Sequence, residues 1–156
     1  MWKQKLTKIE IAHQQLLHAI ELFCSNSNLV SAITLAGVAE EILRSLVKET
    51  GRADSLETEA EERCNMFQAV FGYKKDPKEI RKEEHRIRNE LKHHCSGNDI
   101  ELDLEQEAVD IIDRAIKNYQ MLCPGFSSEF RAFDNKAAAW WRSRENQFLS
   151  QRPELS

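Results

Sequence analysis

Apolar residues recur every three or four positions over most of the chain, which is the spacing of one face of a helix. The first apolar stripe predicts a helix from about Trp2 to Cys24. A second helix is expected from Leu29 to about Thr50, with Asn28 as its cap and Gly51 as its terminator. This second segment is apolar nearly all round through Ala39, so we expect it to be the most buried helix.

Two more helices follow in the middle of the chain. Residues 52–62 are polar and acidic, and they are expected to form a loop that runs into a third helix ending at Gly72. Asp76 and Pro77 then begin a fourth helix, as its N-cap and its first helical residue. The fourth helix is expected to end near residues 96–98, where Ser, Gly and Asn interrupt the pattern.

The last part of the chain predicts a fifth helix and a separate tail. Asp103 with Gln106 is similar to a capping box, and Pro124 with Gly125 stops the fifth helix. Beyond that point Phe and Trp recur near helical spacing, which indicates one or two amphipathic helices. The expected fold is all-α: an antiparallel up-down bundle of about five helices over residues 1–124, followed by a C-terminal helical appendage over residues 125–156.

Composition agrees with a helical fold and indicates the cellular compartment in which we expect the protein. The 156 residues include five Gly and three Pro, which favours helices. No stretch approaches the roughly 20 consecutive apolar residues of a membrane span, and the first residues lack the apolar run of a signal peptide. The four cysteines are widely separated and form no Cys-x-x-Cys pair. We therefore expect reduced thiols in a cytoplasmic protein that does not contact a membrane.

Charge is distributed unevenly along the chain. Residues 74–95 carry eight Lys or Arg against five Asp or Glu, whereas the formal net charge of the whole chain is −4. Within this stretch Arg81, His85, Arg88 and Lys92 follow one another at offsets of four, three and four residues, so they share one stripe of the fourth helix. A local basic stripe in an acidic protein indicates a site for an anion.

The same stretch contains a recognisable motif. Arg88-Asn89-Glu90-Leu91-Lys92-His93 resembles the R-x4-6-H signature of the HEPN superfamily, a group of small all-α nucleases, in which a polar residue such as Asn89 often follows the Arg. Residues 36–46, AGVAEEILRSL, are similar to the early helix of many members, where an Ala-rich stretch leads to a Glu. The resemblance covers residues 1–124 and does not extend to the tail.

The resemblance implies a metal-independent endoribonuclease, working as a homodimer with the motif at the dimer cleft. Arg88 would hold the scissile phosphate, His93 would give or take the proton of the 2′-hydroxyl, and Asn89 would position one of them. Arg81 and Lys92 would contact RNA phosphates. We expect a toxin or defence effector, which would need an antitoxin or regulatory protein. We expect no cofactor, and no metal site, because the histidines have no second ligand pair at metal spacing.

Several alternatives stay open at this point. His94 is the alternative to His93 as the catalytic histidine, and His85 is a candidate assistant. Glu40 either pairs with Arg44 on its own helix or orients Arg88 from the neighbouring one. On a straight helix Arg88 and His93 would lie about 140° apart, so a loosened helix end or a second subunit would have to complete the pair. The alternative function is a non-catalytic HEPN-like module that binds nucleotide, RNA or protein.

Overall fold

The computed structural model describes residues 3–92 and 101–150, without the side chains of residues 87, 88, 91 and 92. Within these ranges the chain forms six helices and no strand, which confirms the all-α prediction. The helices are α1 (Lys8–Cys24), α2 (Leu29–Glu49), α3 (Ser55–Phe71), α4 (Pro77–Lys92), α5 (Leu104–Leu122) and α6 (Ser128–Ser150). No helix in this part of the chain combines the length and the apolar character needed to cross a bilayer.

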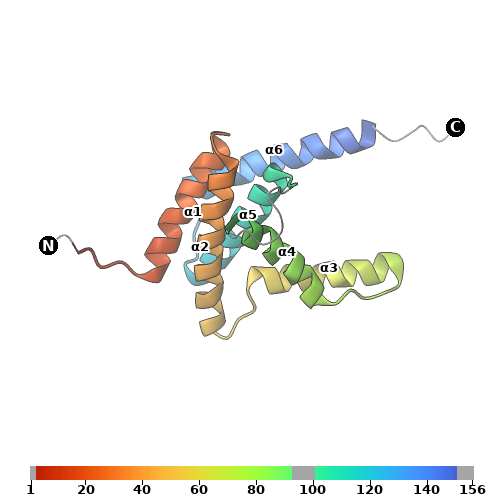
Figure 1. Cartoon of the computed structure of the whole chain (residues 1–156), viewed down its shortest axis with the longest axis horizontal. Coiled ribbons are helices and arrows are strands. Elements are labelled where there is room, and N and C mark those ends of the chain that lie inside the picture. The colour runs from red at the N-terminus through yellow and green to blue at the C-terminus, as the bar shows by residue number, and fades with distance from the viewer. Residues whose placement is uncertain (1–2, 93–100, 151–156) are drawn as a thin grey trace.

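The centre of the fold is the packing of α2 between α1 and α5. Figure 1 shows α1 and α2 running side by side in opposite directions, with α5 against them. Small residues of α2, including Ala32, Ala36 and Ala39, are fully buried and let the neighbouring helices approach closely. The second helix was expected to be the most buried one; α2 has eight buried residues, and α5 has the same number. Larger side chains from the other helices complete this core: Leu16, Ile20, Phe23, Ile112, Ile116, Phe130 and Phe133.

Two helix starts differ from the prediction. The first helix begins at Lys8 and not near Trp2, because Thr7 and Glu10 form a capping box whose side chains each bond the other's backbone N–H. The third helix begins at Ser55, inside the segment expected to be a loop. There Asp54 and Glu57 form a second capping box. Both starts depend on polar residues, which an apolar stripe does not mark.

The other predicted boundaries that fall within residues 3–92 and 101–150 agree with the structure. Gly51 follows α2 with a left-handed φ of 75°, the conformation expected after a helix end. Asp76 accepts a bond from Lys78 N at 2.9 Å, at the start of α4. Asp103 caps α5, but the Gln106 side chain bonds Asp110 and does not complete a capping box. The predicted end of the fourth helix near residues 96–98 lies outside the described residues.

The C-terminal segment is one helix, α6, whose first half belongs to the main core. Phe130, Phe133 and Ala137 are buried there. Lys136 Nζ donates to the carbonyl oxygens of Phe23 (2.5 Å) and Cys24 (3.1 Å), so it satisfies the end of α1. The second half of α6 extends beyond the bundle (Figure 1).

α3 and α4 form a hairpin that projects from the bundle on the side away from α1 (Figure 1). The hairpin has a small apolar core of its own, made by Ala60, Cys64 and Ile80. Its base is joined to α5 by polar contacts: the Ser55 N–H donates to Asn118 Oδ1 at 2.9 Å, and the Ser55 hydroxyl donates to the Arg114 carbonyl at 3.1 Å. The start of the hairpin is therefore held to α5 by hydrogen bonds from a buried Ser to a buried Asn and to a backbone carbonyl.

We predict that Asp54→Ala destabilises the fold by about 2 kcal/mol, because it removes both a buried helix cap and an ion pair. The Asp54 side chain accepts from Glu57 N at 3.0 Å and lies 3.2 Å from Lys48 Nζ at the end of α2. The matched control is Asn28→Ala, which removes the exposed cap of α2, a bond from Ser31 N at 2.9 Å, and should cost about 1 kcal/mol. Urea unfolding measures both values. Equal losses in the two variants would show that the Lys48 contact contributes nothing.

Candidate functional site

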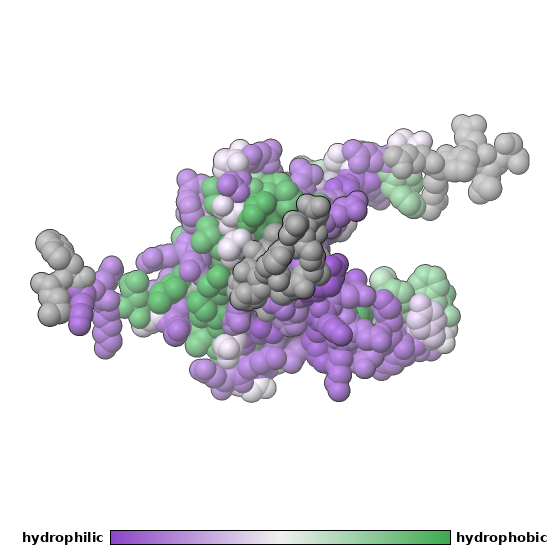
Figure 2. Space-filling model, viewed as in Figure 1, coloured by the Kyte–Doolittle hydropathy of each residue, from purple (hydrophilic) through white to green (hydrophobic). Residues whose placement is uncertain are grey.

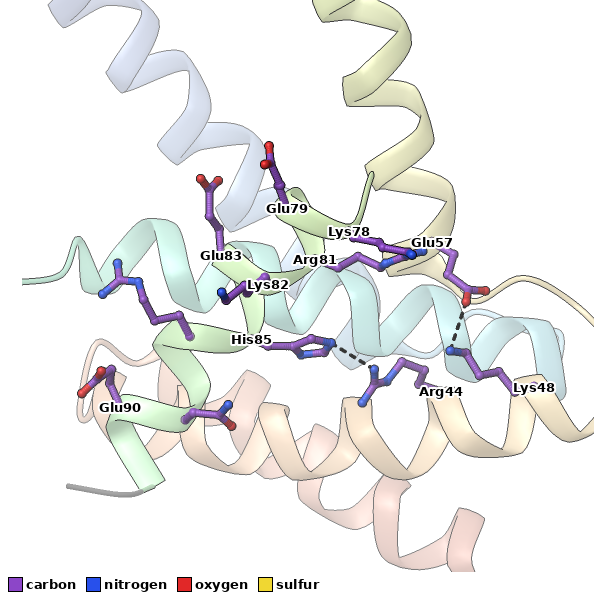
Figure 3. A pocket seen from close by; sticks show the side chains of 12 residues that line it. Arg44, Lys48, Glu57, Lys78, Glu79, Arg81, Lys82, Glu83, His85 and Glu90 are labelled. Atoms are coloured by element: carbon purple, nitrogen blue, oxygen red, sulfur yellow. Dashed lines mark hydrogen bonds and ion pairs between the residues drawn. The ribbon is translucent and has the colours of Figure 1, made fainter. Parts of the chain in front are cut away.

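A groove of about 1040 Å³ lies between α4 and the second half of α2. Figure 3 shows Arg44 and Lys48 extending from α2 and His85 extending from α4 into the space between the two helices, with the first turn of α3 at one end. Among the described residues its lining has six cations and four carboxylates. The cations are Arg44, Lys48, Lys78, Arg81, Lys82 and Arg86; the carboxylates are Glu57, Glu79, Glu83 and Glu90; His85 and Asn89 complete the lining. The groove is therefore positive overall, as an anion site requires.

Ile80, the one buried apolar residue among the described side chains of α4, sets the orientation of the start of the helix. Ile80 is 1% exposed and packs into the hairpin core against α3. The next positions along the helix turn by about 100° each, which brings Arg81 and, one turn later, His85 towards α2. Both side chains line the groove. In Figure 3 His85 points across to Arg44, whereas Glu79 and Glu83 point away from α2.

His85 and Arg44 join the two helices across the groove. Arg44 Nη1 lies 3.2 Å from His85 Nε2, and Arg44 Nε lies 3.5 Å from the Glu40 carboxylate one turn earlier. A guanidinium has donors and no acceptor, so this contact requires His85 Nε2 to accept and its proton to sit on Nδ1. Glu40 is only 2% exposed, and the charge of Arg44 compensates it. The intrahelical Glu40–Arg44 pair expected as one alternative is thus present.

Lys48 has a structural task at the α3 end of the groove. Its Nζ lies 3.1 Å from Glu57 and 3.2 Å from Asp54, the two residues of the α3 capping box. The hydrogen bond to Glu57 is the largest influence on Lys48 and raises the pKa of its ammonium group. Because Lys48 pairs with Asp54 and Glu57, and Arg44 pairs with Glu40, the positive charge offered to a ligand comes mainly from the cations of α4.

The structure brings together part of the predicted site. Arg81, His85 and Asn89 line one groove, and Glu40 lies beneath it through Arg44. Arg88 belongs to helix α4, but its side chain and that of Lys92 lie outside the described residues, as do His93 and His94 entirely. A role of Glu40 in orienting Arg88 therefore stays a prediction.

Sequence reasoning named Arg44 only as a partner of Glu40 and missed that Arg44 and Lys48 of α2 line the groove. Arg44 and Lys48 stand one helical turn apart and follow the buried Glu40 by four and eight residues. This regular spacing was a usable signal, since it places all three on one stripe of α2. Lys82 and Arg86 were likewise detectable, because they stand one residue beyond Arg81 and His85.

A second charged cluster lies on the other side of α4, against α5. Arg114 is 5% exposed, and its guanidinium lies 3.0 Å from Glu84 and 3.6 Å from Glu59. Arg63 also contacts Glu84, at 2.9 Å. Burial works against the charged form of Arg114, but the surrounding carboxylates, Glu84 foremost, outweigh it and raise the pKa of Arg114. This cluster fixes the hairpin and faces away from the groove.

Carboxylates outnumber cations at this cluster, and their mutual repulsion affects the pKa of Glu107. Its partial burial, together with the negative charges of Glu84 and Asp110, raises the pKa of Glu107 to about 7. Burial likewise raises the pKa of Asp110. Among the described residues no group of three or more His, Cys, Asp or Glu is arranged to hold a metal ion.

Comparisons with family models, with curated proteins and with solved structures gave no match. The HEPN assignment therefore depends on the resemblance of residues 88–93 and 36–46, and on the groove beside them.

We predict that Glu107→Gln stabilises the protein at pH 8 by about 1 kcal/mol, a value reduced from the full pKa shift because the side chain is partly solvated. The folded-state pKa of about 7 exceeds the ordinary value of 4.5. Ionisation therefore costs the folded state stability, and this cost appears as the pH rises from about 4.5 to 7. The variant and the parent should be equally stable at pH 4. Urea unfolding at both pH values measures the difference, and a gain that persists at pH 4 would refute the explanation.

Proposed function

We propose that this chain is a metal-independent endoribonuclease of HEPN type, which cleaves RNA by attack of a ribose 2′-hydroxyl on the adjacent phosphate. The observation that supports the proposal most directly is the position of the motif. Asn89 and Glu90, the second and third residues of the Arg88–His93 signature, line the cation-rich groove between α2 and α4. Substrate phosphates held in this groove would thus lie beside the signature.

The proposed roles match the chemistry of the residues. RNA cleavage without a metal requires a base for the 2′-hydroxyl proton and a fixed positive charge for the phosphate oxygens. His93 supplies the titratable imidazole in the proposal, and Arg88 supplies the permanent charge with its forked donors. Asn89, which is exposed on the groove wall, positions the phosphate or the ribose. DNA lacks the 2′-hydroxyl and would not be cleaved.

The remaining groove residues would bind the strand and support the site. Arg81 lines the groove, and in the proposal Arg81 and Lys92 contact the RNA phosphates. His85 bridges to Arg44, so we assign it to holding the two groove walls together. His94 is the alternative to His93. The proposal includes a homodimer, in which the motifs of two subunits meet, a role as a toxin or defence effector in the cytoplasm, and control by an antitoxin or regulatory protein.

One observation favours the non-catalytic alternative. Four carboxylates share the described groove lining with the six cations, which limits the attraction for a long polyanion. A module that binds a nucleotide, a short RNA segment or a protein without cleaving it would need no more charge than this. The two functions differ in one measurable property, cleavage.

We predict that the purified chain cleaves single-stranded RNA in the presence of EDTA and leaves 2′,3′-cyclic phosphate ends. His93→Ala should lower the cleavage rate about 10²- to 10⁴-fold, because it removes the proton-transfer group, and Arg88→Ala should lower it about 10²- to 10³-fold. Gel analysis of end-labelled RNA measures the rates, with single-stranded DNA of the same sequence as the uncleaved comparison.

The matched control is His18→Ala, since His18 is an exposed histidine on α1 that pairs with Glu21. This variant should cleave at the rate of the parent chain. Cleavage that survives His93→Ala but not His94→Ala would transfer the catalytic role to His94. A folded protein that binds RNA and never cleaves it would establish the binding module instead.

A further inference from the structure

Three aromatic rings gather at the free end of the α3–α4 hairpin. The ring centroids of Phe67 and Phe71 lie 5.5 Å apart, and Tyr73 lies 6.1 Å from each of them. We call these three residues the ring cluster. Phe71 is 62% exposed and Tyr73 is 54% exposed, so the cluster presents ring surface to solvent. Figure 2 shows the apolar colour at this end of the hairpin, beyond the hydrophilic surface that covers the rest of it.

The charged residues next to the ring cluster in the sequence are mainly positive, since residues 64–78 contain Lys74, Lys75 and Lys78 against one carboxylate, Asp76. The Lys75 ammonium lies 4.9 Å from the centroid of the Phe67 ring, within the range of a cation–π contact. Contact between the ring clusters of two copies would bring four lysines together, which electrostatic repulsion disfavours. A ligand with negative charge and apolar faces fits this surface better.

The ring cluster and the groove are connected by a series of cations. Lys78, Lys82 and Arg86 follow Lys74 at intervals of four residues. On α4 this interval corresponds to about 6 Å along the helix axis, on one face. Lys78, Lys82 and Arg86 all line the groove. A polyanion bound in the groove can therefore continue along α4 towards the ring cluster.

We propose that the ring cluster is a stacking platform for the bases of single-stranded RNA whose phosphates follow these cations into the groove. Aromatic side chains beside a basic groove bind single strands in this way, because every base has a π-face and the backbone supplies the charge. Bases in a duplex are already stacked and paired, so the platform selects unpaired nucleotides. This inference rests on the proposed function, since it names the kind of RNA that the groove receives.

The test compares an RNA that has bases with one that lacks them. The probes are a fluorescent oligouridylate of about 12 nucleotides and an abasic ribose-phosphate oligomer of the same length. Binding is measured by anisotropy in EDTA, with the full chain carrying His93→Ala so that the probe stays intact. The chain that carries only His93→Ala should bind oligouridylate more tightly than the abasic oligomer.

Replacing Phe71 and Tyr73 together by Ala should weaken oligouridylate binding about tenfold and leave abasic binding unchanged. Replacing both by Trp should preserve binding, since Trp keeps a stacking surface. The matched control is Phe126→Ala, which removes a 76% exposed Phe from the connection between α5 and α6 and should leave both affinities unchanged. Circular dichroism and thermal unfolding verify that each variant is folded.

The remaining outcomes separate this inference from the proposed function. Cleavage of RNA by a ring-cluster variant with unchanged oligouridylate affinity would refute the platform and leave the nuclease in place. Base-dependent binding without cleavage by the unmodified chain would retain the platform and refute the nuclease. The platform would also be refuted if the Ala replacements weakened the binding of both oligomers equally, or if the parent chain bound no RNA at all. If the ring-cluster variant formed a smaller assembly in solution than the parent chain but bound RNA equally well, the platform would also be refuted. The ring cluster would then be a protein contact, to which the exposed Met66 and Val70 would contribute.

Discussion

The attachment of the α3–α4 hairpin depends on one buried charge, the guanidinium of Arg114. Removing a charge from water costs several kcal/mol unless it is paired. α5 places Arg114 where it is 5% exposed, so each helix of the hairpin must present a carboxylate to it. α3 supplies Glu59 and α4 supplies Glu84. These ion pairs therefore hold both helices of the hairpin against α5.

The same contact sets the direction of the groove residues. Glu84 and His85 are adjacent on α4, so their side chains point in directions about 100° apart. Once Glu84 is fixed on Arg114 at 3.0 Å, His85 is turned towards α2, where it meets Arg44 at 3.2 Å. α4 thus lies between a carboxylate-rich side and a cation-rich side. One orientation of α4 therefore places Glu84 against Arg114 and His85 in the groove.

The regular spacing of apolar residues was sufficient to predict the positions of α2 and α5, because the apolar stripes of these helices face a large core. It failed at the starts of α1 and α3, because polar capping boxes define those starts and the apolar pattern does not. The candidate site shows the same limit. Arg81 and His85 share one helix, so their spacing alone groups them. Arg44 comes from another helix, 41 residues before His85, and the packing of α4 against α2 brings the two together.

The small apolar core of the hairpin has a consequence for the dynamics of the protein. Segments with few buried apolar contacts open at lower free energy than the main core, often as one cooperative unit. Ala60, Cys64 and Ile80 contribute little burial compared with the shared core of α1, α2 and α5. Among the described residues the hairpin therefore has the smaller apolar core, and we expect it to open at a lower free energy than the bundle. In such an opening α4 would move away from α2, and the contact between His85 and Arg44 across the groove would be lost.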